Sequence, residues 1–215
     1  MKSIFVVSLV ALLVSACANP INLKTASQYA EGCRGFQAQN EWWKARRACG
    51  RAAINFKLGG AQDQVIAFHL YEYGRTSGAI CDYVEAQRGF DEAMKLDQGT
   101  GRPIYLMSLL AMTRLSSAQE KFAEAVGHYE KFWLETSKAF GEKADSKALA
   151  EKTDPIAIAE IYEEQADIYR HVGNSALSKA HKDRAQELRA ANPNKNKTST
   201  DIDYIPYGKF CDQKS

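Results

Sequence analysis

Among the reactive residue types of this sequence, the cysteines are the first candidates for nucleophiles, metal ligands or disulfides. Cys81 precedes Asp82 at the start of the segment CDYVEAQRGFDEAMKLD. A nucleophilic thiolate needs an electropositive setting and usually a partner base, whereas the neighbouring carboxylate raises the cost of ionising the thiol. We therefore expect Cys81 to be structural. With Cys17 set aside, an even set of cysteines remains that three disulfide pairings could connect: Cys33, Cys49, Cys81 and Cys211.

Other reactive side chains do not form a catalytic or metal-binding pattern. The histidines show neither an H-E-x-x-H motif nor metal-ligand spacing, and no cysteine pair has the C-x2-C form; the histidines are His69, His128, His171 and His181. The sequence also lacks the motifs of an acylated serine and of a phosphate loop. Adjacent acids such as Glu163 and Glu164 lie on charged helix faces, where solvation accounts for them. We predict no enzyme activity, no metal and no cofactor.

The overall charge argues against a polyanion as the main partner. The chain has 28 basic and 26 acidic residues, which leaves a formal net charge of +2. Such a balance supplies no large field of one sign with which to hold a phosphate backbone. We therefore expect no nucleic-acid partner. Hydrophobic residues make up 45% of the 215 residues, which is typical of a folded globular chain.

The amino terminus has the pattern of a secretory signal. Lys2 supplies a basic start, and the apolar stretch from Ile4 to Val14 is too short to span a bilayer. The following Val-Ser-Ala-Cys ending at Cys17 resembles the lipobox of bacterial lipoproteins. The resemblance implies that residues 1–16 are a removed signal peptide and that Cys17 becomes the lipid-modified (palmitate-bearing) first residue of a short tether over residues 17–23. In that family Ala18 at the next position implies transfer to the outer membrane; an ordinary signal peptide with a chance cysteine is the alternative.

The elements that must position the remaining residues are helices. Apolar and small residues recur at helical spacing from Tyr29 to about Leu188, with little proline or glycine inside the segments. A pattern A-x3-aromatic-x2-A repeats, with a small residue twelve positions before each leading alanine. Three sets follow it wholly or in part: Cys33, Ala45, Cys49 and Ala52; Gly74, Ala86, Phe90 and Ala93; Thr113, Ala125, Tyr129 and Phe132. A fourth, more divergent set is Ala166, Tyr169, Ser178 and Ala185, and in every set the first and last members are nineteen residues apart.

This register resembles the tetratricopeptide repeat, whose unit is a pair of antiparallel helices. Helix axes approach to about 8 Å only where the facing side chains are small, and the aromatic residues bury the area beside them. The resemblance implies an all-α array of about four helical hairpins over residues 24–191, with Cys81 in the turn of the second hairpin. Sel1-like repeats are a neighbouring class that fits as well. Residues 192–215 read as a polar linker followed by an extended tail.

Within the repeat register the cysteines suggest a pairing. Cys33 and Cys49 lie on the two helices of the first hairpin at similar distances from its turn, so a bond between them would cross the hairpin. That pairing leaves Cys81 to Cys211, which would fasten the tail to the array. In the loop-entropy model the two bonds would constrain the unfolded chain by about 3 and about 5 kcal/mol. The tail, which carries Tyr204, Ile205, Tyr207 and Phe210, would either cap the last helix, which we favour, or occupy the groove as a bound peptide.

The resemblance also implies a binding surface. In the tetratricopeptide family the first helices of the hairpins line a concave face that holds a peptide. The residues just past the small positions should point into it, and they are Arg34, Arg75 and Arg114, with Asp167 in the fourth unit. Such arginines could grip carboxylates through forked hydrogen bonds, with apolar contacts from Phe68, Tyr71, Met107 and Leu110. The alternative is that each arginine pairs with a local glutamate.

Together these features predict an outer-membrane lipoprotein that faces the periplasm and binds an acidic, partly apolar segment of an envelope protein. The resembling lipoproteins serve as pilotins for secretins, as factors in barrel assembly and as activators of peptidoglycan synthases, so we expect a scaffold, an assembly factor or a regulator. A surface-exposed or secreted repeat protein that contacts host or other cells is one alternative. An enzyme acting on envelope glycan is another, and it would need a buried pair of carboxylates.

Overall fold

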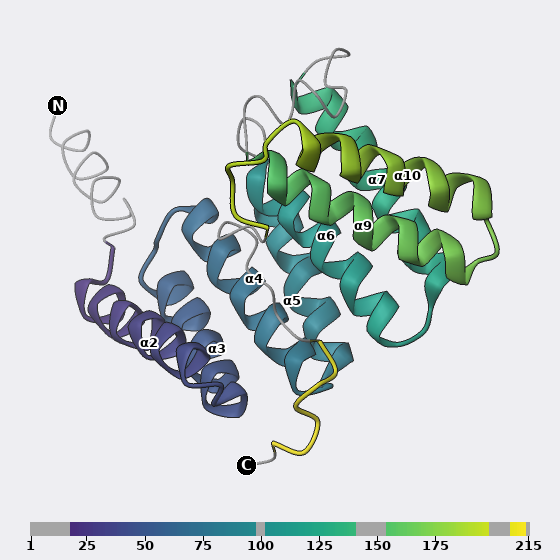
Figure 1. Cartoon of the computed structure of the whole chain (residues 1–215). Helices are drawn as coiled ribbons and strands as arrows, with labels where there is room; N and C mark the ends of the chain where they lie inside the picture. The colour runs from purple at the N-terminus through teal and green to yellow at the C-terminus, as the bar shows by residue number, and fades with distance from the viewer. Residues whose placement is uncertain (1–17, 98–101, 141–153, 198–206, 214–215) are drawn as a thin grey trace, which may run out of the picture.

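The computed structural model describes residues 18–97, 102–140, 154–197 and 207–213. These residues form eight α-helices and no β-strand. The helices are α2 (Pro20–Ala38), α3 (Trp42–Leu58), α4 (Asp63–Ala79), α5 (Tyr83–Leu96), α6 (Pro103–Ala118), α7 (Phe122–Phe140), α9 (Pro155–His171) and α10 (Ser175–Ala190). They pack as four consecutive antiparallel hairpins laid side by side (Figure 1), which confirms the predicted all-α class and the helical-hairpin array.

The four hairpins turn with the same local backbone geometry. Asn40, Cys81, Glu120 and Gly173 each stand two residues past the end of a first helix, and each has a positive φ between 58° and 77°. A left-handed residue at this place lets the chain reverse while the last carbonyl groups of the helix are satisfied. Only one of the four is a glycine, so three hairpins hold a non-glycine residue in a conformation that costs of order 1 kcal/mol. The surrounding helix contacts have to offset that cost.

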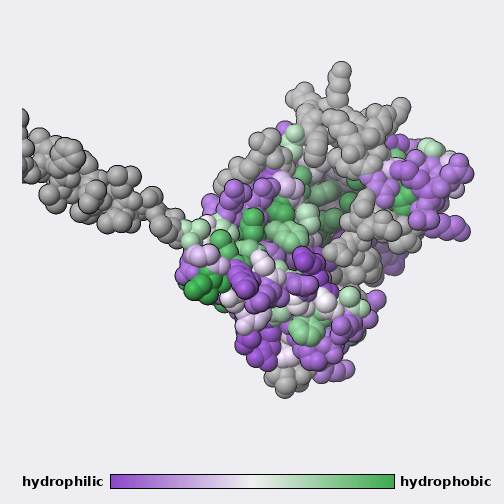
Figure 2. Space-filling view, turned by 90° about the vertical axis from the view of Figure 1, so that its left-hand side faces the viewer, coloured by the Kyte–Doolittle hydropathy of each residue, from purple (hydrophilic) through white to green (hydrophobic). Residues whose placement is uncertain are grey.

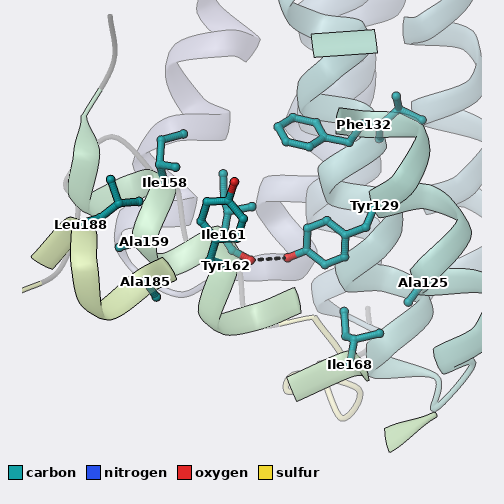
Figure 3. Packing of buried hydrophobic residues seen from close by; sticks show 11 residues of the cluster. Ala125, Tyr129, Phe132, Ile158, Ala159, Ile161, Tyr162, Ile168, Ala185 and Leu188 are labelled. Carbon is teal, nitrogen blue, oxygen red and sulfur yellow. Dashed lines mark hydrogen bonds between the residues drawn. The ribbon is translucent and has the colours of Figure 1, made fainter. Parts of the chain in front are cut away.

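Small and aromatic residues of the repeat register fill the interior as predicted. Ala86, Phe90 and Ala93 of α5 are fully buried, and the corresponding residues of the other hairpins are buried too. The largest buried cluster joins α6, α7, α9 and α10 around Tyr129, whose hydroxyl donates to the carbonyl oxygen of Ile161 at 3.2 Å (Figure 3). This bond satisfies a buried phenol and fixes the third hairpin against the fourth.

Both expected disulfides are present. Cys33 on α2 is bonded to Cys49 on α3, and Cys81 in the turn between α4 and α5 is bonded to Cys211 of the tail. The Cα atoms are 5.1 Å apart in each pair. Cys81 is therefore a structural residue, as its neighbour Asp82 suggested, and Asp82 instead accepts a hydrogen bond from the backbone N–H of Glu85 at the start of α5.

The tail lies along the edge of the array where the first three hairpins turn. The backbone N–H groups of Gly208 and Phe210 donate to the carbonyl oxygens of Gly78 and Ala79 at 3.1 and 3.0 Å. The Phe210 ring packs on Trp42, with centroids 5.6 Å apart. The expectation that the tail caps the last helix is therefore wrong for residues 207–213, which contact the first three hairpins instead (Figure 1). Tyr204 and Ile205 lie outside the described residues.

At the other terminus α2 begins at Pro20, inside the segment predicted as a tether. The side chain of Asn19 caps this helix by accepting from the N–H groups of Ile21 and Asn22. Cys17, the predicted lipidation site, and the predicted signal peptide lie outside the described residues. Among the helices that the structure describes, none combines the length and apolar character needed to cross a membrane.

Candidate functional site

The small residues that define the register lie where the two helices of each hairpin meet. Cys33, Gly74, Thr113 and Ala166 are all buried. The next residue of each first helix is therefore turned toward the surface that first helices share. The four environments differ greatly: Arg34 is exposed, Arg75 is only 2% exposed, Arg114 is half-buried and Asp167 is exposed.

A hollow of about 490 Å³ lies between α2 and α4. Arg34 and Phe68 line its mouth, and the buried side chains of His69, Glu72 and Arg75 form part of its wall. Three of the seven residues predicted to bind a peptide, Arg34, Phe68 and Arg75, thus come together here. Because Arg34 contributes an exposed guanidinium and Phe68 an exposed aromatic ring, the hollow offers both charge and apolar area to a ligand.

His69 is held in its neutral form at this hollow. Its ring stacks on Phe56 with centroids 4.5 Å apart and meets Phe68 edge-on at 5.2 Å. Burial, and secondarily the charge of Arg34, lowers the pKa of His69 from 6.5 to about 4. At neutral pH the imidazole is therefore an uncharged group that can donate or accept one hydrogen bond beside the Arg34 guanidinium.

A buried ion pair stiffens the same wall. Arg75 donates to Glu72 at 2.5 Å, and its guanidinium lies over the Tyr71 ring, 5.3 Å from the centroid. The other Glu72 oxygen accepts from the Gln37 side-chain amide at 2.8 Å, which connects α2 with α4 across the hollow. A charge this deeply buried has to be paired, because leaving either partner alone would cost several kcal/mol. Arg75 therefore supports the wall and is not presented to a ligand.

Arg114 on the third hairpin is also ion-paired with a glutamate. Its guanidinium binds both carboxylate oxygens of Glu164 on α9 at 2.9 Å each. The Tyr129 hydroxyl, whose one proton also faces the carbonyl oxygen of Ile161, lies 3.1 Å from the same carboxylate. Burial by itself would lower the pKa of Arg114, but the charge and hydrogen bonds of Glu164 outweigh it and raise the pKa above its usual value. The pair connects the third and fourth hairpins.

A second hollow of about 530 Å³ lies between α6 and α9. Arg114, Glu164 and Asp167 line it, together with Phe122 and His171, whose rings stack at 4.1 Å. Both acidic and basic groups line its walls, so this hollow does not favour a ligand of one charge as clearly as the first.

Tyr207 of the tail lines the second hollow. Its ring lies against Gly78 of α4 and close to Leu115 of α6, where any side chain larger than hydrogen at residue 78 would collide with it. Burial raises the pKa of the Tyr207 phenol well above its usual value, so the hydroxyl stays protonated.

The predicted arginine ladder is therefore not a row of three equally exposed guanidinium groups. Arg75 forms an ion pair with Glu72 of its own helix, which is the alternative that the sequence left open. Arg114 forms an ion pair with Glu164 of the fourth hairpin. Of the predicted apolar contacts, Phe68 lines the first hollow, Tyr71 is buried against Phe90, and Met107 and Leu110 line neither hollow. Whether Arg34 and Phe68 bind a peptide stays a prediction.

The residues of the first hollow that the sequence did not predict as ligand contacts include Gln37, His69 and Glu72. Gln37 stands one helical turn after Arg34 on α2, and Glu72 stands one turn before Arg75 on α4, so helical spacing alone could have placed both beside the arginines. Nothing in the sequence indicated that His69 would be buried and uncharged. No group of histidine, cysteine and acidic side chains suited to a metal occurs in the described part of the chain.

Comparison with known proteins shows the fold class only. No protein-family model matches this sequence, and no curated protein matches it. Among solved structures, BtubC (BKLC) from P. vanneervenii is similar, with a TM-score of 0.66 at 15% sequence identity. The alignment covers 80% of this chain and 65% of the BtubC chain, so this protein spans less than two thirds of that neighbour's length. The likeness supports a helical-repeat protein, and at this identity it supports nothing about activity.

Proposed function

We propose that this protein is a tetratricopeptide-like lipoprotein of the outer membrane that faces the periplasm and acts as a binding scaffold for an envelope protein. The hollow between α2 and α4 receives an acidic, partly apolar segment of that partner. A helical-hairpin array supports this role because it presents a surface made from several first helices.

The observation that carries the proposal is the chemistry of the first hollow. Arg34 is exposed, lines the hollow and has a planar guanidinium that can bind a carboxylate in forked geometry. Phe68 is 37% exposed beside it and offers an apolar contact. His69 is uncharged at neutral pH and adds a hydrogen-bonding group without adding a charge. A peptide that alternates acidic and apolar side chains matches this wall.

The membrane part of the proposal rests on the Val-Ser-Ala-Cys segment at Cys17. A lipid at this residue would fix the location of the array, and the hollow would select the partner. Scaffold, assembly and regulatory roles in secretin, barrel or peptidoglycan synthesis pathways are all consistent with such an arrangement.

The test is crosslinking in living cells followed by mass spectrometry of the purified protein. Arg34→Glu should weaken capture of the partner about tenfold or more, because the reversal replaces an attraction with a repulsion at the ligand carboxylate. Arg47→Glu is the matched control, since Arg47 is an exposed arginine of the same hairpin that does not line the hollow. Both variants should stay folded and keep their location.

A partner captured equally by the wild type and both variants would contradict a binding site at this hollow. Protection from protease added to intact cells, with cleavage after the outer membrane is opened, is the expected result for a periplasm-facing protein. Cleavage in intact cells would favour the surface-exposed alternative.

A further inference from the structure

Large hydrophobic side chains are exposed at the end of the first hairpin where α2 begins and α3 ends. Ile21 of α2 is 74% exposed, and Leu58 and Ile54 of α3 are 64% and 59% exposed. Ile54 and Leu58 stand one helical turn apart and so share a face of α3. Folding leaves this apolar area in contact with solvent at one end of the array.

The chain segment before α2 is fixed against the same end. The backbone N–H of Asn19 donates to the carbonyl oxygen of Gly59 at 3.0 Å, and the Leu23 side chain packs on Gly59. A methyl group added at Gly60 would lie 3.7 Å from the Cα of Ala18. Ala18, the residue that follows Cys17 in the sequence, therefore lies at this end of the hairpin.

Basic side chains accompany the apolar ones. Lys24 stands one turn after Ile21 on α2, and Lys57 precedes Leu58 on α3. Both lysines are exposed, and neither forms an ion pair within the described residues. Acidic groups also lie nearby: Asp63 is in the first turn of α4, and Glu92 of α5 lines a hollow together with Ile54 and Lys57.

Figure 2 shows hydrophobic residues gathered beside the point where the amino-terminal segment joins the array. We call Ile21, Lys24, Ile54, Lys57 and Leu58 the end patch. Its composition, exposed aliphatic side chains with lysines at their border, is the composition of protein surfaces that lie at the headgroup level of a bilayer. A protein partner would require no particular relation to Cys17, whereas a bilayer has to lie there if that residue is lipidated.

We propose that the end patch rests on the membrane surface that holds the lipid anchor. Ile21, Ile54 and Leu58 enter the interface, while Lys24 and Lys57 contact lipid phosphates. The contact sets the orientation of the array, with the hairpin turns and the tail pointing away from the bilayer. This inference rests on the proposed lipidation of Cys17, because the patch acts only beside an anchor.

The test places a photocrosslinking amino acid, benzoylphenylalanine, at single positions of the full-length protein expressed in cells. Positions 21 and 58 report on the end patch. Positions 84 and 134 are matched controls, because Val84 and Leu134 are also exposed, at 79% and 55%, and belong to α5 and α7. After irradiation of membranes, mass spectrometry measures phospholipid joined to the protein and, separately, the lipid on Cys17.

We expect phospholipid adducts at positions 21 and 58 to exceed those at 84 and 134 by about fivefold or more. Lys24→Glu combined with Lys57→Glu should lower the adduct yield at position 21, since the acids repel anionic headgroups. Equal yields at all four positions in a protein that carries the Cys17 lipid would overturn the inference and leave the anchor intact. A protein without lipid at Cys17 would overturn both.

Discussion

In the second hairpin the backbones of α4 and α5 approach each other closely at Gly74 and Gly89, and a substitution there tests whether small residues are needed between paired helices. A Cβ atom added at Gly89 of α5 would lie 2.9 Å from the Cα and the N of Gly74 and from the carbonyl oxygen of Leu70. All three are backbone atoms of α4, so no side chain can move aside to make room. Gly89→Ala therefore requires α4 and α5 to separate.

The expected cost follows from two opposing effects. Alanine is favoured over glycine inside a helix by about 1 kcal/mol. Overpacking a well-filled contact costs about 1–3 kcal/mol, and backbone neighbours place this site at the upper end of that range. We expect the free energy of unfolding of Gly89→Ala to fall by about 2 kcal/mol. Gly127→Ala on α7 is the control, because a Cβ there meets nothing within 4 Å and should leave the protein as stable or up to about 1 kcal/mol more stable.

Denaturant unfolding followed by circular dichroism, with the disulfides intact, measures both variants under the same conditions. The two substitutions are chemically identical and both lie inside helices, so propensity cancels in the comparison. If Gly89→Ala proved as stable as Gly127→Ala, the close backbone approach would be refuted, and with it the reason for small residues at this crossing.

Replacing Cys81 and Cys211 together with alanine should lower the free energy of unfolding by up to about 5 kcal/mol, because the bond closes residues 130 apart in sequence; limited proteolysis should then cleave the tail first. Stability should fall as the pH drops from 6.5 toward 4, since the depressed pKa of His69 makes the unfolded chain bind that proton first. His69→Phe, titrated with denaturant at several pH values, should show a shallower loss in that window. Arg114→Met should cost about 2–4 kcal/mol by leaving Glu164 unpaired, and in denaturant melts Glu164→Gln should restore part of that loss when combined with it.

Helix positions and the interior register were predictable because they depend on spacing within one helix or one hairpin. Ala86, Phe90 and Ala93 recur every three or four residues, and that period alone places them on one face. Cys33 and Cys49 lie across one hairpin, so local geometry was also sufficient for their disulfide. The left-handed turn residues were not evident, because Asn40, Cys81 and Glu120 are not glycines.

The candidate site was only partly predictable. The repeat register predicted that Arg34, Arg75 and Arg114 lie on the face formed by the first helices. It did not predict how exposed each side chain is. Glu164 stands fifty residues from Arg114 in the sequence, and no pattern within a hairpin relates the two. Gln37 meets Glu72 only because α2 and α4 lie next to each other.

By itself, the sequence determined an all-α repeat, the placement of small residues between paired helices and the cysteines that staple it, because each depends on short-range periodicity and on the size of side chains. Only the tertiary structure decided that Arg75 and Arg114 are paired with glutamates while Arg34 is exposed at a hollow. It also decided that Tyr207 packs on Gly78, and that Ala18 lies beside the apolar end of the first hairpin. Those outcomes depend on which hairpins and tail residues become neighbours after folding. Burial and ion pairing arise from that proximity, which a helical period does not encode.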